Sequence, residues 1–236
     1  MEKEMITTIS FDGDGTLWDF EQVMRRSLRY ALDELQLYVP GEQSSQLTIE
    51  KMIQIRDNIA EELKGKIVNL EQIRLIAFQK TLEHIGIKND SLANRLNQIY
   101  LKHRFEDIEL YPDVIDTLDI LAKKFRIGLL SNGNNYPERC GLAEHFSFIV
   151  FSQDYGVEKP DQRFFEIALE KAGCSHNELL HVGDSLKDDV YGAKNAGIKS
   201  VWLNRDNKEI DNSIKPEYEI TNLRKLQATI ENIQKK

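Results

Sequence analysis

Two aspartates, Asp12 and Asp14, stand two positions apart directly after an apolar run in the stretch TTISFDGDGTLWDF. Like charges this close disfavour the charged form of each other, so something must offset that cost. A divalent cation would do so. Carboxylate oxygens with few other protein ligands suit Mg²⁺, which keeps water and shares the phosphate oxygens of a substrate. The pair therefore predicts a magnesium site.

Other polar groups follow apolar runs later in the chain. They are Ser131, Asn132 and Gly133 after RIGLL, Lys159 in GVEKP, and Asp184, Asp188 and Asp189 in GDSLKDD. A serine hydroxyl and backbone N–H groups bind anions, and a lysine adds positive charge. Each segment alone could be an ordinary turn or helix cap. Together they predict a site for a phosphoryl group between a carboxylate and positive charge.

Two similar motifs do not fit the first aspartate pair. The third glycine of a dinucleotide-binding loop is missing, because Trp18 stands at its position. A calcium loop needs glycine at its sixth position and glutamate at its twelfth, where this chain has Leu17 and Val23. Neither a dinucleotide loop nor a calcium loop is therefore expected.

The elements that would position these groups alternate in type. Residues 5–11 have a strand pattern, and from about residue 111 onward strands and helices alternate, which implies a parallel sheet with helices on both faces. In that part, KDDVYGAKNAG (187–197) is expected to form one helix that Gly197 ends, and a polar stretch, 205–217, precedes a last helix around 221–234. Between them, apolar residues recur at helical spacing in 20–38 and roughly over 47–64, 69–86 and 89–105.

We therefore expect an α/β fold, a doubly wound parallel sheet with an inserted helical-bundle cap. The core would comprise residues 1–17 and 107–236, and the cap residues 18–106. Ligands bind at the carboxyl ends of the strands in such sheets, where the polar groups above stand. Asp12 and Asp184, expected on neighbouring strands, would reach one ion.

Composition limits the partners and the compartment. A net charge of −8, from 31 basic and 39 acidic residues, argues against a general nucleic-acid binder, although a local site can still hold a small anion. The two cysteines form no metal-binding or redox pair. No apolar run is long enough to span a membrane. We expect a cytoplasmic protein, a monomer or weak homo-oligomer, with no nucleic-acid or membrane partner.

The four motifs in this order resemble the haloacid dehalogenase superfamily of phosphohydrolases, in its subclass with a helical (C1-type) cap. FDGDGTLWD matches its first motif, LLSNG its second, VEKPD its lysine motif and HVGDSLKDDVYGAKNAG its fourth. The resemblance implies that Asp12 is a nucleophile that forms an aspartyl-phosphate, and that Asp14 protonates the leaving alcohol and then deprotonates water.

The same resemblance assigns the remaining groups. Ser131, the backbone of Asn132, and Gly133 would hold the phosphate, and Lys159 would stabilise Asp12 and the transferred group. Asp12, the backbone carbonyl of Asp14 and Asp184 would hold Mg²⁺, with Asp188 and Asp189 in or near its second coordination sphere. His181, inside a strand pattern, is expected to be a buried structural residue.

The resemblance thus implies a Mg²⁺-dependent phosphatase acting on a small phosphorylated metabolite, a nucleotide or sugar phosphate. A phosphomutase on the same core is an alternative, and so is a binding protein on a retired hydrolase core. A 2-haloacid dehalogenase is disfavoured, because a departing halide needs no proton whereas a departing alkoxide does, and Asp14 supplies that acid.

Overall fold

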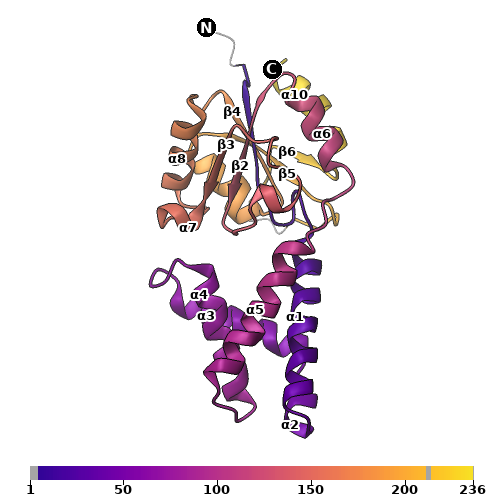
Figure 1. The fold of residues 1–236 in the computed structure, drawn as a ribbon. Coiled ribbons are helices and arrows are strands. Elements are labelled where there is room, and N and C mark those ends of the chain that lie inside the picture. The colour runs from indigo at the N-terminus through magenta and orange to yellow at the C-terminus, as the bar shows by residue number, and fades with distance from the viewer. Residues whose placement is uncertain (1–4, 211–213, 236) are drawn as a thin grey trace. The chain divides into compact units, whose positions relative to one another are not determined.

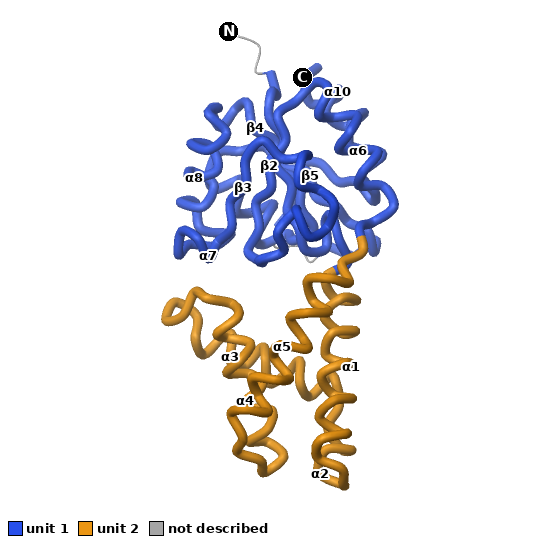
Figure 2. Tube along the Cα trace, viewed as in Figure 1, with its two compact units in different colours: residues 1–19, 110–236 blue, residues 20–109 orange. Residues whose placement is uncertain are grey.

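The computed structural model describes residues 5–210 and 214–235, and it divides into two compact units, shown in different colours in Figure 2. Unit 1 combines the first 19 residues with residues 110–236, and unit 2 is the continuous segment 20–109. Within the described ranges, no helix is both long and apolar enough to cross a membrane.

Unit 1 is built on a six-stranded sheet in the order β3-β2-β1-β4-β5-β6, with every neighbouring pair parallel. The strands are β1 (Thr8–Phe11), β2 (Arg126–Ser131), β3 (Phe148–Phe151), β4 (Leu179–Gly183), β5 (Lys199–Leu203) and β6 (Tyr218–Ile220). β1 lies centrally, between β2 and β4, although it is distant from both in sequence. The predicted α/β fold with a parallel sheet is confirmed.

Helices cover both faces of this sheet (Figure 1). The helical segments of unit 1 are α6 (Val114–Leu121), α7 (Ser152–Tyr155), α8 (Gln162–Ala172), α9 (Gly192–Asn195) and α10 (Leu226–Ile233), with short turns η1 (Pro137–Arg139), η2 (Leu186–Tyr191) and η3 (Leu223–Lys225). Apolar side chains of α8 and α9 pack on β2, β3 and β4 in one buried cluster. The central strands are buried on both faces, as a covered parallel sheet requires.

Unit 2 is entirely helical in its described elements. It contains α1 (Phe20–Tyr38), α2 (Glu42–Ser45), α3 (Ile49–Leu63), α4 (Leu70–His84) and α5 (Asp90–Glu106). One apolar cluster draws on α1, α3, α4 and α5, and therefore gives this unit its own core. Thr48, Asn69 and Asn89 accept backbone N–H bonds at the starts of α3, α4 and α5, which satisfies donors that a helix leaves open.

Three details of unit 1 differ from the sequence prediction. The first strand begins at Thr8 rather than at residue 5. A short strand, β6, follows the polar stretch that had no assigned structure. The segment after Ser185, predicted as one helix, begins as a turn of π-helix over Leu186–Tyr191 before α9.

Candidate active site

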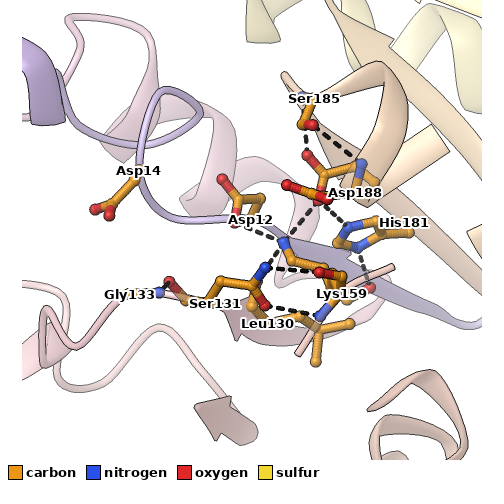
Figure 3. Close-up of polar contacts among 12 residues, drawn as sticks. Asp12, Asp14, Leu130, Ser131, Gly133, Lys159, His181, Ser185 and Asp188 are labelled. Carbon is orange, nitrogen blue, oxygen red and sulfur yellow. Dashed lines mark hydrogen bonds and ion pairs between the residues drawn. The ribbon is translucent and has the colours of Figure 1, made fainter. Parts of the chain in front are cut away.

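The polar groups predicted from the sequence gather at the carboxyl edge of the sheet in unit 1 (Figure 3). Asp12 follows β1, and its backbone N–H donates to the carbonyl of Val182 in β4 over 2.8 Å. Asp184 directly follows β4, so the expectation that Asp12 and Asp184 lie on neighbouring strands is confirmed. Ser131 is the last residue of β2, on the other side of β1.

Lys159 is the cation at the centre of this group. Its side chain is buried, and Nζ donates to Asp12 Oδ1 over 2.6 Å, to Asp189 Oδ1 over 2.6 Å and to the carbonyl of Leu130 over 3.0 Å. An ammonium group has three N–H donors, so each has an acceptor. Burial lowers the pKa of Lys159, but the two carboxylates outweigh that effect and raise it above its ordinary value. Lys159 is therefore held as a charged group.

The side chain of Asn132 holds the backbone of Lys159 in place. Its Nδ2 donates to the carbonyl of Lys159 over 2.9 Å, and its Oδ1 accepts the N–H of Lys159 over 2.8 Å. The carbonyl of Asn132 itself accepts a hydrogen bond from the Ser152 hydroxyl. The sequence prediction assigned Asn132 a backbone role toward phosphate, which remains a prediction. Its side-chain role was missed, because nothing in the sequence links two residues 27 positions apart.

Asp189 reaches the site through the π-helical turn η2. Ser185 accepts the backbone N–H of Asp188 at its hydroxyl and those of Asp189 and Val190 at its carbonyl, which tightens the start of the turn. The turn brings Asp189 so close to β4 that a Cβ on Gly183 would lie 2.1 Å from Asp189 Cγ. Such turns often occur at functional sites, and this one aims a carboxylate back at the strand end.

The carboxylate of Asp189 has partners on both oxygens. Besides Lys159, Oδ1 bonds His181 Nε2 at 3.0 Å, and Oδ2 accepts the backbone N–H of Ser185 over 2.9 Å. Burial alone would raise the pKa of Asp189, but Lys159 and His181 hold it well below its usual range. Asp189 is thus a fixed anion that orients Lys159.

His181 is fully buried, as predicted, and it links two strands to Asp189. Its Nδ1 lies 2.9 Å from the hydroxyl of Ser10 in β1, while Nε2 faces Asp189. Burial lowers the pKa of His181, and Lys159 adds to this, while Asp189 opposes it. The sequence indicated burial of this histidine, but its contact with a site carboxylate was not anticipated.

Asp12, Asp184 and Asp189 each bring a carboxylate oxygen within 4.8 Å of the other two. Burial raises the pKa of Asp12 well above its ordinary value, opposed by Lys159 and reinforced by the two other carboxylates. Burial, followed by repulsion from Asp189, raises the pKa of Asp184 to about 7. Two buried carboxylates and a partly buried one beside a single ammonium group leave uncompensated negative charge. An all-oxygen donor set of this kind fits Mg²⁺.

The carboxylate of Asp14 lies outside this trio, on the loop after β1 (Figure 3). Its Oδ1 accepts hydrogen bonds from Trp18 Nε1 over 2.5 Å and from Asn135 Nδ2 over 3.0 Å. The metal contact predicted for its backbone carbonyl stays a prediction. In the same loop Gly15 has φ +83°, and a Cβ there would lie 2.6 Å from Asp184 Oδ2. A glycine therefore lets the loop pass close to Asp184.

The remaining predicted residues lie at the same edge. The backbone N–H of Gly133 donates to Ser131 Oγ over 3.0 Å, so this hydroxyl acts as an acceptor and keeps its own O–H to donate. Asp188 is partly exposed, and burial, then the charge of Asp189, raises its pKa. Whether Asp188 approaches a metal stays a prediction.

Comparison with known proteins agrees with this architecture. Residues 6–197 match the family model of the haloacid dehalogenase-like hydrolases. The phosphatase YigB of Escherichia coli, which acts on 5-amino-6-(5-phospho-D-ribitylamino)uracil, is 29% identical over 95% of this chain and 96% of its own length. The pyrimidine 5'-nucleotidase YjjG of the same organism is 27% identical over 94% of this chain and 96% of its own.

A solved structure gives a different activity on the same fold. The 2-haloacid dehalogenase from Pseudomonas syringae pv. tomato has a TM-score of 0.79 and 31% identity, covering 97% of this chain and all of that one. The family model alone spans well over half of the sequence. The matched residues include the strand ends that carry Asp12, Ser131 and Asp184. The chain belongs to the haloacid dehalogenase-like hydrolase family.

Proposed function

We propose that the protein is a Mg²⁺-dependent phosphatase that hydrolyses small phosphate monoesters through an aspartyl-phosphate on Asp12. The observation that carries this proposal is the arrangement at the sheet edge. There Asp12 contacts a fixed ammonium group, lies beside a second carboxylate, and is followed two residues later by Asp14. A nucleophile, charge compensation and an acid–base group are what phosphate-ester cleavage requires.

Each residue has a defined role in the proposed reaction. A carboxylate oxygen of Asp12 attacks phosphorus, the bond from phosphorus to the ester oxygen breaks, and the proton of Asp14 goes to that departing oxygen. Water then attacks the phosphorus, gives its proton to Asp14, and the bond to Asp12 breaks to release inorganic phosphate. Lys159 keeps Asp12 oriented, and Ser131 donates its hydroxyl to a phosphate oxygen.

The carboxylates of Asp12 and Asp184, with the backbone carbonyl of Asp14, would hold Mg²⁺ at this edge. When bound, the ion compensates charge on the transferred phosphoryl group. Asp189 is engaged by Lys159, His181 and the Ser185 N–H, so we assign it to the surrounding shell. The metal ligands and these residue roles are proposals.

The substrate class follows from what two relatives share. The names of YigB and YjjG describe a phosphorylated ribityl chain on a uracil ring and a pyrimidine 5'-nucleotide. Both combine a pyrimidine ring with a phosphorylated five-carbon sugar unit. We propose substrates of this kind for the present chain, with the helical unit 20–109 acting as a cap that selects among them.

Dehalogenation is the second candidate, because the Pseudomonas dehalogenase is similar over nearly the whole chain. Both reactions use a carboxylate nucleophile, but halide leaves without a proton. Two N–H groups hold Asp14 in place. A departing halide does not need a positioned acid, whereas a departing alkoxide does. We therefore place phosphate-ester cleavage first.

The test is product release from two sets of compounds. Phosphate would be measured over nucleotides, sugar phosphates and phosphorylated ribityl pyrimidines, and halide over 2-haloacids, each with Mg²⁺ or with a chelator. Asp12→Asn is the inactive blank, and Asp116→Asn, at an exposed position in α6, is the matched control. We expect chelator-sensitive phosphate release that Asp12→Asn abolishes. Halide release without phosphate release would overturn the proposal.

A further inference from the structure

Two polar side chains inside the sheet, those of Ser10 and His181, have no role in the reaction proposed above. Ser10 is the third residue of β1, His181 is the third residue of β4, and the two residues are paired in the sheet register. Both are fully buried. Figure 3 shows the His181 ring next to Lys159 and Asp12, so its contacts bear on the site.

Packing does not explain a histidine at position 181. The ring lies edge-to-face on Phe165 of α8, with ring centroids 5.4 Å apart, and every residue of β4 is buried. An apolar side chain would fill this place without the free-energy cost of burying a polar ring. The two hydrogen bonds of the imidazole, one with Ser10 and one with Asp189, are therefore the reason for a histidine.

The partners of the ring determine which nitrogen carries its proton. Both oxygens of Asp189 accept N–H groups, Oδ1 from Lys159 and Oδ2 from the backbone of Ser185. Nε2 of the ring lies 3.0 Å from Oδ1 and must be an N–H donor, because two facing acceptors would repel each other. In the neutral imidazole Nδ1 is then an acceptor, and the Ser10 hydroxyl donates to it over 2.9 Å.

A directed chain of hydrogen bonds thus runs from the interior of the sheet to the proposed nucleophile. Ser10 donates to His181, and His181 donates to Asp189. Asp189 also accepts an N–H of Lys159 over 2.6 Å, and Lys159 gives another N–H to Asp12 over 2.6 Å. Fixing Asp189 therefore fixes the direction of the ammonium group, and through it the carboxylate of Asp12.

A neutral donor suits this place better than a charged one. A lysine or arginine at position 181 would also donate to Asp189, but it would put a second positive charge beside Lys159 and repel it. Histidine with its proton on Nε2 supplies the N–H without that charge. It therefore orients Asp189 while leaving Lys159 as the cation that contacts Asp12.

We propose that Ser10 and His181 are positioning residues that hold Asp189, and through it Lys159, so that the Asp12 carboxylate is aligned for attack on phosphorus. This inference rests on the phosphatase activity proposed above. Alignment of a nucleophile contributes mainly in the transition state. Loss of the chain should therefore lower kcat and leave the binding of phosphate almost unchanged.

The kinetic test separates turnover from binding, with p-nitrophenyl phosphate as substrate, Mg²⁺ present and inorganic phosphate as a competitive inhibitor. Ser10→Ala should lower kcat about fivefold or more, and His181→Leu about thirtyfold or more, while the inhibition constant of phosphate changes no more than about threefold. His181→Gln keeps a side-chain N–H for Asp189 and should turn over at least about fivefold faster than His181→Leu.

Ser27→Ala is the matched control for Ser10→Ala. Ser27 is also fully buried, and its hydroxyl donates to the carbonyl of Val23 over 2.7 Å within α1. The variant loses one buried hydroxyl bond that has no connection to Asp189. We expect it to lower the free energy of unfolding as Ser10→Ala does, with kcat within about twofold of the wild type.

A second measurement needs no activity. In the full-length protein labelled with ¹⁵N-histidine, NMR should show a proton on Nε2 of His181 and none on Nδ1, with His181→Gln identifying the signals of this ring. This arm also covers the case in which His181→Leu does not fold. A proton on Nδ1 would overturn the inference.

Two kinetic results would overturn it as well. One is an equal loss in kcat and in phosphate affinity for Ser10→Ala, and the other is a folded His181→Gln that is no faster than His181→Leu. Absence of phosphate release by the wild type, from p-nitrophenyl phosphate and from the wider panel above, would instead reject the phosphatase proposal. The two failures are therefore distinguishable.

Discussion

At the scale of single residues, the buried charges of the site depend on Lys159. Its ammonium group is shared by Asp12 and Asp189, and the backbone that carries it is held by the Asn132 side chain. Removing one member of a buried ionic group costs more than the group contributes, because the remaining charges stay buried and unpaired. Lys159 is therefore a proposed functional residue that also stabilises the fold at the carboxyl edge of the sheet.

Lys159→Met should lower the free energy of unfolding by about 3 kcal/mol at neutral pH. Without the ammonium group, the carboxylates would bind protons more tightly in the folded than in the unfolded chain, so the loss should be small near pH ~4 and grow as the pH rises. Added Mg²⁺ should recover part of it. Denaturant titrations at several pH values measure this, and a loss that is independent of both pH and Mg²⁺ would contradict it.

The sequence predicted which residues stand at the sheet edge and that Lys159 would stabilise Asp12, but not most of their other contacts. Asp12 and Asp184 could be placed together because residues at the ends of parallel strands share an edge, and β1 and β4 are neighbours. The partners of the carboxylates, Asn135 for Asp14 and His181 for Asp189, could not be predicted. Hydrogen bonds between distant segments leave no periodic pattern in a sequence.

At the scale of elements, the π-helical turn η2 determines where Asp189 lies. Its start depends on Ser185, whose hydroxyl accepts the backbone N–H of Asp188 over 3.0 Å. The sequence pattern predicted an ordinary helix here, because a π-helical turn is a rare, single-turn variation within helices. The close contact between Asp189 and Gly183, which a Cβ would obstruct, is a tertiary feature. The short strand β6 was likewise missed, since three residues give too little pattern.

Ser185→Ala should lower stability by about 1 kcal/mol, as the loss of an N-cap usually does, and should also reduce phosphatase activity because the turn carries Asp189. Thr48→Ala is the matched control, because Thr48 caps α3 in the helical unit through the N–H of Lys51 over 3.2 Å. Thr48→Ala should lower the free energy of unfolding by a similar amount, but it should not reduce turnover of p-nitrophenyl phosphate to the same extent. Thermal unfolding and initial rates of both variants test this. Equal activities of Ser185→Ala and Thr48→Ala would count against the assigned role of η2.

At the scale of the whole chain, unit 1 is assembled from two separated segments. An ion pair between buried Asp113 and partly buried Arg205 helps to join parts of it. Asp113 accepts bonds from both terminal nitrogens of Arg205, each over 3.0 Å, and from the backbone N–H of Leu223 over 2.7 Å. Arg205 also donates to the carbonyl of Thr16, in the loop that carries Asp14. These contacts connect the beginning of the chain with its last third.

Asp113→Asn should lower the free energy of unfolding by about 3 kcal/mol at neutral pH. Burial opposes ionisation of Asp113, but bonds from Arg205 and Leu223 hold its pKa below the ordinary value. A depressed pKa contributes stability above the unfolded pKa of about 3.9 and loses it as the pH falls through the folded pKa. The difference in the free energy of unfolding between the wild type and Asp113→Asn should therefore shrink in acid. The control Asp116→Asn should have the same free energy of unfolding as the wild type. A difference that persists unchanged in acid would contradict this.

The family of the chain and its class as a hydrolase were predicted correctly, because four motifs in order are carried by the sheet that the structure shows. The substrate could not be predicted in the same way. Its choice is proposed to lie with the helical unit, whose residues the sequence shows only as amphipathic helices. Amphipathic spacing specifies which face is buried and says nothing about what the other residues bind.

The most direct test of the central claim is chemical identification of the residue that carries phosphate. The Asp14→Asn variant lacks the residue proposed as the base of the second step. It would be mixed with p-nitrophenyl phosphate and Mg²⁺, quenched in acid and reduced with borohydride, which converts an aspartyl-phosphate to homoserine. Peptide mass spectrometry should then find homoserine at position 12 alone, and none after chelation of Mg²⁺. Phosphate release by the wild type without modification of Asp12, or with modification elsewhere, would contradict the account.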